Sequence, residues 1–174
     1  MDDQFAQAAP EESFFMELAL AQAKEAADKG EVPVGAVIVR DREVVGAGHN
    51  RREELQNPLA HAEIAAIEAA SRRLGSWRLT DCDLYVTLEP CIMCVGAILQ
   101  ARIRRLVFGC LDPKAGAVQS LYRLCEDKRL NHRLPATGGV AAEECARLMS
   151  EFFARLREKS DHHTESWPSP VEGA

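Results

Sequence analysis

Two short segments, about 30 residues apart, constrain the fold of this chain more than any other feature. The first is His61-Ala62-Glu63, and the second is Pro90-Cys91-Ile92-Met93-Cys94. One histidine and two cysteines are three preferred ligands of zinc, which normally takes four ligands in a tetrahedron. A structural zinc site closes the fourth position with protein, whereas a catalytic site leaves it to water. The fold must bring both segments together if they share one ion.

Glu63 supplies a carboxylate that can move protons to and from a zinc-bound water. Zinc lowers the pKa of that water from about 15.7 toward about 7, so hydroxide is available at neutral pH. The combination of H-x-E with P-C-x-x-C is typical of zinc-dependent nucleobase deaminases, which exchange a ring amino group for a carbonyl. We therefore predict one zinc per subunit, bound by His61, Cys91 and Cys94, with Glu63 as the catalytic residue.

Simpler interpretations of these residues stay open. Cys91, Cys94 and His61 can be buried side chains that never meet, and Glu63 can be a solvated surface carboxylate. Two cysteines three apart in the first turns of a helix share a face, and the positive helix end favours thiolates. Positions i and i+2 of a helix do not share a face, so Glu63 must reach the ion from the side. Glu89, just before Pro90, is not assigned a proton-transfer role.

Length and composition are those of one ordinary globular domain, with 174 residues of which 47% are apolar. The longest apolar stretches are too short for a membrane span, and the acidic start does not resemble a secretory signal. We therefore expect a cytoplasmic protein with no membrane association and with its remaining four cysteines reduced.

The net charge of −6 arises in the tails, because residues 13–157 carry 20 basic and 19 acidic side chains. Basic clusters such as Arg51-Arg52 and Lys128-Arg129 fit either a solvated surface or an RNA contact.

Helix and strand patterns alternate along the chain. They predict helices over 14–28, 58–74, 90–102 and 141–157, and strands over 34–39, 44–45, 84–88 and 106–108. Asn57 is the expected N-cap of the second helix, and Asp41-Arg42 the turn of a hairpin. This order predicts an α/β fold, a three-layer α/β/α sandwich with a mixed central sheet. Residues 13–158 form the expected zinc-dependent deaminase domain, between acidic segments 1–12 and 159–174 that we expect to be disordered.

Eight segments of the chain carry a recognisable family pattern: residues 31–37, 48–51, 60–64, 85–91, 107–109, 112–117, 130–133 and 152–153. In these segments the chain resembles the bacterial tRNA-specific adenosine deaminases, which have a cytidine deaminase-like fold and convert the wobble adenosine of an arginine tRNA to inosine. The resemblance spans about residues 14–157. The last three blocks matter most, because small-molecule deaminases of the same fold need only the zinc motifs.

The resemblance implies roles for five further residues. Asn50 would hydrogen-bond the flipped base, and Phe153 would offer an aromatic surface to a splayed base. Asp112, Asn131 and His132 would contact nucleotides of the anticodon stem-loop. The family also implies a homodimer in which both subunits shape each RNA site. Each residue has a plainer alternative: Asn50 can shape a strand end, Asp112 can cap a turn, Asn131 and His132 can form a polar turn, and Phe153 can be a core residue.

Two features depart from the family pattern, namely the acidic, histidine-containing tail after residue 157 and the pair Cys110-Leu111 before Asp112.

Two other functions also remain open. A deaminase of a free base or nucleotide, such as cytosine or guanine, would use the same zinc site, and the acidic net charge favours it. A non-catalytic zinc-binding scaffold for RNA or a partner would have no use for Glu63.

Overall fold

The computed structural model describes residues 10–164, with side chains as far as Glu158, and is built on a mixed five-stranded sheet. The strands are β1 (Gly35–Arg40), β2 (Glu43–His49), β3 (Asp83–Leu88), β4 (Arg105–Cys110) and β5 (Ala136–Gly138), in the spatial order β2-β1-β3-β4-β5. β1 runs antiparallel to β2 and β3, whereas β4 runs parallel to both β3 and β5. The sheet therefore combines an N-terminal hairpin with a parallel half.

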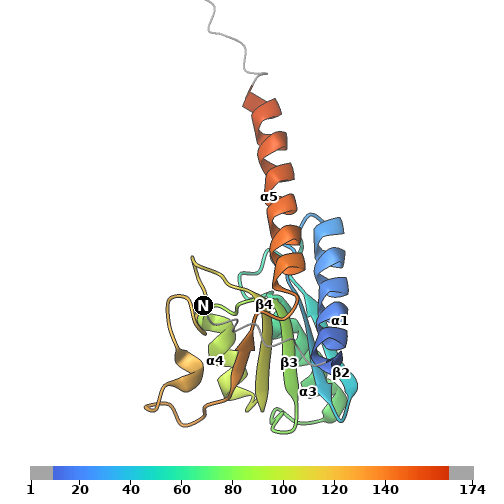
Figure 1. The fold of residues 1–174 in the computed structure, drawn as a ribbon. Coiled ribbons are helices and arrows are strands. Elements are labelled where there is room, and N and C mark those ends of the chain that lie inside the picture. The colour runs from blue at the N-terminus through green and yellow to red at the C-terminus, as the bar shows by residue number, and fades with distance from the viewer. Residues whose placement is uncertain (1–9, 165–174) are drawn as a thin grey trace, which may run out of the picture.

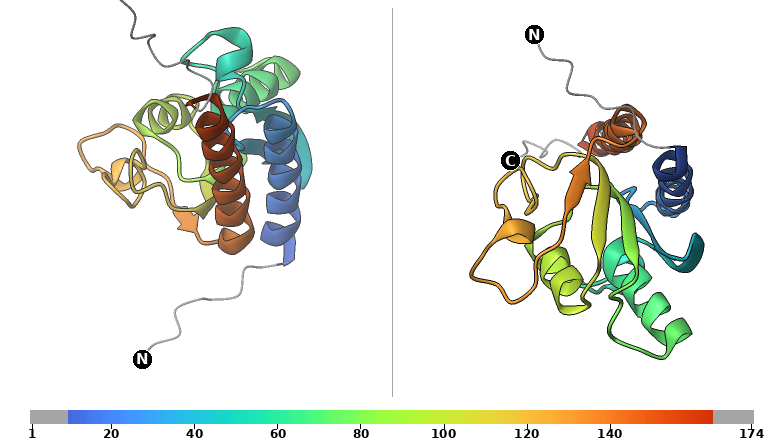
Figure 2. Two further views of the ribbon diagram at one scale, coloured as in Figure 1. Left: turned by 90° about the horizontal axis from the view of Figure 1, so that it is seen from above. Right: turned by 60° about the horizontal axis from the view of Figure 1, so that its bottom comes forward.

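Helices cover both faces of this sheet, as Figures 1 and 2 show. α1 (Pro10–Asp28) and α5 (Ala142–Thr164) lie on one face, and α3 (Ala62–Leu74) and α4 (Ile92–Gln100) lie on the other. Successive side chains of a strand point to opposite faces, so Phe108 belongs to the core beneath α3 and α4 and Val107 to the core beneath α1 and α5. The predicted three-layer α/β/α sandwich is confirmed.

The hairpin between β1 and β2 forms where the sequence predicts it. Arg40 pairs with Glu43 across the turn, and the two intervening residues, Asp41 and Arg42, have φ angles of 50° and 64°. Two consecutive residues with positive φ are the geometry of a type I′ turn, whose twist matches that of the paired strands.

The close packing of α3 on β2 depends on the absence of a side chain at Gly48. A Cβ atom built at Gly48 would lie 2.6 Å from Ala65 Cβ and 2.8 Å from Ala62 O. Ala62, Ala66 and Ala70 form the buried face of this helix. Small residues on both elements therefore let the helix lie close to the sheet, and this contact fixes the position of its first turn.

The outer helices extend further than expected from the sequence. α1 begins at Pro10 rather than residue 14, and the Glu12 carboxylate pairs with the Arg105 guanidinium at 2.6 Å. Residues 10–12 are thus helical and do not belong to a disordered segment. α5 continues past residue 158 to Thr164. The rest of the two expected disordered segments, 1–9 and 165–174, lies outside the described residues. Within the described chain, no helix is long and apolar enough to cross a membrane.

The structure also corrects the start of the second predicted helix. α3 begins at Ala62 rather than Pro58, with His61 as its N-cap. The Asn57 side chain accepts a hydrogen bond from the backbone N–H of Leu59 at 2.9 Å, so it shapes a turn instead of capping a helix. The helix predicted over 90–102 likewise starts two residues later than expected, at Ile92, with Cys91 as its N-cap. The short helices α2 (Arg52–Leu55) and η1 (Leu124–Glu126), together with β5, were not predicted.

Candidate zinc and substrate site

Two of the three predicted zinc ligands are N-cap residues of different helices. His61 precedes α3 with φ −81° and ψ 155°, and Cys91 precedes α4 with φ −76° and ψ 174°. Neither side chain makes a capping hydrogen bond to its own helix. Both side chains are therefore free to serve another purpose at the helix ends, where the exposed N–H groups favour negatively charged sulfur.

The third ligand, Cys94, lies in the first turn of α4 and is fully buried. Its sulfur is 3.4 Å from His61 Nδ1, and the Cys91 sulfur is 3.8 Å from the same nitrogen. All three ligand atoms lie within 4.8 Å of one another. Ligand bonds of about 2.3 Å for sulfur and about 2.0 Å for nitrogen give tetrahedral edges of about 3.6–3.8 Å. The His61, Cys91 and Cys94 arrangement therefore fits a zinc ion.

Zinc binds thiolate and neutral imidazole, so metal binding would have to displace the protons that these groups hold in its absence. A hydrogen bond from Cys94 lowers the pKa of the Cys91 thiol to about 4, and the same contact raises the pKa of Cys94. The pair thus holds one proton between two sulfurs. The contact with Cys91 raises the pKa of His61.

Glu63 lies in the first turn of α3, directly beside this group of ligands. It is only 4% exposed, and burial raises the pKa of its carboxyl group. Because His61 is an N-cap with extended backbone, the helical rule that separates positions i and i+2 does not apply to this pair. A buried carboxyl with a raised pKa beside the ligands is suited to accepting and returning a proton.

Glu89 is the second carboxylate near the ligands, and its environment is different. Burial alone would raise its pKa, but hydrogen bonds from Ser120 and from backbone N–H groups outweigh that effect and lower it. The carboxylate therefore stays ionised. This contrast supports the sequence-based choice of Glu63 rather than Glu89 for proton transfer.

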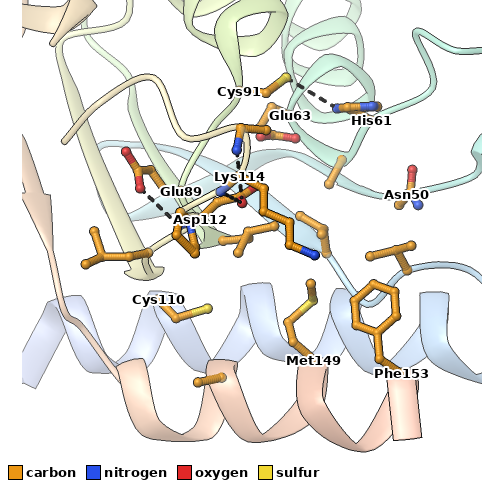
Figure 3. A pocket seen from close by; sticks show the side chains of 18 of the residues that line it. Asn50, His61, Glu63, Glu89, Cys91, Cys110, Asp112, Lys114, Met149 and Phe153 are labelled. Carbon is orange, nitrogen blue, oxygen red and sulfur yellow. Dashed lines mark hydrogen bonds between the residues drawn. The ribbon is translucent and has the colours of Figure 1, made fainter. Parts of the chain in front are cut away.

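The ligand group and Glu63 open into one cavity with a volume of about 520 Å³ (Figure 3). The cavity lies at the carboxyl ends of β3 and β4. Its other walls come from Asn50 and Arg52, from Leu111 to Ala115, and from Ala146, Met149, Ser150 and Phe153 of α5. Apolar walls with a few polar groups at one end are typical of a pocket for a flat organic ligand.

Asn50 lies in the cavity wall at the end of β2, where it is 7% exposed. Its side-chain amide donates to Glu31 Oε2 at 3.4 Å. Glu31 is itself buried and accepts hydrogen bonds from the backbone N–H groups of Glu53 at 3.2 Å and Glu54 at 2.7 Å. Glu31 therefore holds the segment that carries Asn50. The sequence contained it, as the first residue of the 31–37 block, but gave no sign of its partners.

Asp112 and Phe153 also line the cavity. Asp112 Oδ1 accepts hydrogen bonds from the N–H groups of Lys114 at 3.0 Å and Ala115 at 3.2 Å, so the turn-capping alternative describes at least this oxygen. Phe152 is buried, whereas Phe153 is 41% exposed. Phe153 is thus not a core residue and presents its ring at the cavity.

Asn131 and His132 lie away from this cavity. His132 Nε2 is 2.9 Å from the carbonyl oxygen of Ile103, and Asn131 Oδ1 accepts from the Arg102 guanidinium at 3.2 Å. Both contacts tie the loop to the end of α4, which agrees with the polar-turn alternative. The structure therefore does not bring these two residues together with the other seven predicted site residues of the same chain.

The family model for the cytidine and deoxycytidylate deaminase zinc-binding region matches residues 10–110. This match includes all three ligands and Glu63. The fold and the site accordingly define a zinc-dependent deaminase.

Comparison with individual proteins shows which family of zinc-dependent deaminases the chain belongs to. The tRNA-specific adenosine deaminase of Streptococcus pyogenes serotype M1 is 46% identical over 149 residues, which are 86% of this chain and 87% of that protein. A solved structure from work on A-to-I editing by tRNA:A34 deaminases at the wobble position is 48% identical, with a TM-score of 0.76, and covers 78% of this chain and 99% of its own. The chain belongs to the family of tRNA-specific adenosine deaminases.

A guanine deaminase structure from Bacillus subtilis is less similar. It is 39% identical, with a TM-score of 0.54, and the match covers 56% of this chain and 63% of that one.

Proposed function

We propose that this enzyme converts adenosine to inosine at the wobble position of a tRNA, and we expect an arginine tRNA as substrate. The observation that carries the proposal is a single cavity lined by Glu63, Asn50 and Phe153 and by two of the zinc ligands, His61 and Cys91, with Cys94 buried beside them. Such a pocket suits a base that has left its stack, because it combines apolar walls with a few fixed polar groups.

In this reaction water and adenosine give inosine and ammonia. His61, Cys91 and Cys94 would hold the zinc ion, which when bound would supply water activated for attack at neutral pH. Glu63 accepts the water proton and delivers it to N1, the ring nitrogen beside C6. It then takes the second proton from the hydroxyl group added at C6, which becomes the carbonyl, and passes it to the amino group, which leaves as ammonia. The burial of Glu63 keeps bulk water away from these transfers.

The remaining pocket residues would hold the flipped adenosine. Asn50 faces it with an amide whose orientation is limited by the bond to Glu31. Phe153 offers a face for stacking, which contributes about 1–3 kcal/mol per base in nucleic-acid complexes. Asp112, with one oxygen engaged in its own turn, has the other available for an anticodon nucleotide.

We further propose a homodimer that binds the anticodon stem-loop with residues of both subunits. Asn131 and His132 lie outside the cavity of their own chain, so their expected RNA contacts fit a site completed by a second copy. Large apolar side chains of α4 and of the segment after β4, namely Ile92, Leu121 and Tyr122, are about half exposed, as expected for a surface that a partner covers. We propose residues 13–158 as the catalytic unit and the cytoplasm, where tRNA is decoded, as its location.

The decisive experiment incubates the purified protein with an arginine tRNA that has adenosine at the wobble position and analyses the nucleosides for inosine. Guanine, cytosine and free adenosine are tested in parallel, and a tRNA with guanosine at the wobble position controls for background. Inosine formation that disappears in Glu63→Ala supports the proposal. Ammonia release from a free base without inosine would replace it by the small-molecule alternative, and no turnover with any substrate would favour the scaffold.

A further inference from the structure

Glu89 is among the most deeply buried charged residues of the described chain, with 1% of its surface exposed. It follows the last residue of β3 and precedes Pro90 and the ligand Cys91. Nothing in the proton chemistry uses it. A buried carboxylate requires several hydrogen-bond donors to offset the loss of hydration, so its partners indicate its purpose.

The partners of Glu89 all belong to the loop over residues 112–120. Its Oε1 atom accepts from the backbone N–H groups of Val118 at 3.1 Å, Gln119 at 2.7 Å and Ser120 at 2.9 Å. Its Oε2 atom accepts from the backbone N–H of Asp112 at 3.0 Å and from the Ser120 hydroxyl. One carboxylate thereby joins both ends of the loop.

The middle of the loop lies against the same carboxylate. A Cβ atom at Gly116 would lie 2.3 Å from Cδ and Oε2 of Glu89, so only glycine allows this approach. The loop is also joined to the metal side, because Ala117 N–H donates to the Pro90 carbonyl at 2.9 Å and Gly116 forms an isolated β-bridge with Cys91. The position of the loop relative to the zinc ligands is therefore set at Glu89.

Residues 112–115 of this loop are part of the cavity wall. Figure 3 shows Glu89 beside Asp112, with Lys114 next to it, between the zinc ligands and α5. We propose that Glu89 is a positioning residue that holds the 112–120 loop in the shape required to bind the substrate. This inference rests on the proposed function. It adds to that function by naming the side chain that positions one wall of the substrate pocket.

A carboxylate is required because both of its oxygens act as acceptors. In Glu89→Gln the amide oxygen can keep the three bonds at Oε1, and the Ser120 hydroxyl can rotate to accept from the amide nitrogen. The N–H of Asp112 then faces another donor and loses its partner. The substitution keeps the shape of the side chain and disturbs the loop at the residue that enters the cavity.

The test compares wild type, Glu89→Gln and Ser120→Ala on an anticodon stem-loop with adenosine at the wobble position, and measures kcat, KM and zinc content for each. Glu68→Gln is the matched control, because it removes the same charge from an exposed position on α3. For Glu89→Gln we expect KM to rise about tenfold, while kcat per bound zinc changes less than about twofold. Ser120→Ala removes one of the five hydrogen bonds, so it should raise KM by a smaller factor. This variant replaces Glu89→Gln in the test if Glu89→Gln folds poorly.

A merely structural role would give a different result. If Glu89 only supported Cys91, zinc content and kcat would fall together while KM stayed constant, and that outcome would overturn the inference. Hydrogen exchange provides a readout that needs no substrate: the amide of Asp112 should exchange faster in Glu89→Gln, and unchanged exchange at this amide would also overturn the inference. If the wild-type enzyme were inactive on RNA, that result would contradict the proposed function. Hydrogen exchange would still show whether Glu89 holds the loop.

Discussion

The two sides of the pocket are built in different ways. The metal side consists of the first residues of α3 and α4, two helices on the same face of the sheet. The opposite side consists of the 112–115 segment and of Met149 and Phe153 from α5, which packs on the other face. The metal side is thus defined by local backbone geometry at helix ends. The opposite side exists only because distant segments are held in place, and it is the side on which substrate selection can vary while the chemistry stays the same.

The largest effect is expected on the metal side from loss of a ligand. Cys91→Ala leaves two ligands for the ion, so zinc content should fall from about one per chain to near zero, and deamination with it. Metal analysis and inosine formation measure both. Cys125→Ala is the matched control, because Cys125 is buried outside the cavity and should keep zinc and turnover. Full activity of a zinc-free Cys91→Ala protein would refute the assigned ligand set.

Glu63→Gln should separate metal binding from proton transfer. The amide keeps the size of the side chain but cannot carry the proton, so kcat should fall by about 10²–10⁴-fold. Zinc content and thermal stability should remain close to those of wild type. Retention of more than about a tenth of the wild-type kcat would move the proton-transfer role to another group.

On the opposite side, substitutions should change binding more than chemistry. Phe153→Ala removes a stacking surface for a base, so KM for the stem-loop should rise about tenfold with kcat nearly unchanged. Leu156→Ala on the same helix, equally exposed and outside the cavity, is the control. A fall in kcat at constant KM would mean that α5 contributes to the reaction rather than to binding.

The smallest effect concerns charge at the cavity rim. Lys114 is exposed beside Asp112, where the phosphates of a bound anticodon would pass. Lys114→Ala should weaken stem-loop binding by a few-fold and reduce the slope of log affinity against log salt by about one. Lys24→Ala, on α1 and paired with Glu144, should leave the slope unchanged. A salt response that is flat in the wild type would point to a small-molecule substrate instead.

The metal side of the pocket, defined by local backbone, could be predicted from local sequence patterns, whereas the opposite side, built by distant segments, could not. The spacing of His61, Cys91 and Cys94 identified the metal side without any structure, and the alternation of helix and strand identified the sandwich. The start of α3 was predicted four residues too early, because an asparagine before a proline signals a turn as well as an N-cap.

Other features depend on contacts between distant residues and left no local pattern. Glu89 binds amides 23 to 31 residues further along the chain, and Glu31 binds amides 22 and 23 residues further along. β5 has only three residues, and its pairing with β4 is decided by the sheet rather than by its own composition. The roles expected of Asn131 and His132 came from resemblance alone and stay predictions.

Gly48 shows how the dependence of the site on contacts between distant residues would appear in a mutational screen. The residue lies on β2, and it is not part of the wall of the candidate site. Any side chain there would push against Ala62 and Ala65 and displace the turn from which His61 and Glu63 extend. Selection for loss of inosine would therefore recover substitutions of Gly48 together with those of the zinc ligands. In an activity map this glycine would look like part of the chemistry, although it touches neither the metal nor the base.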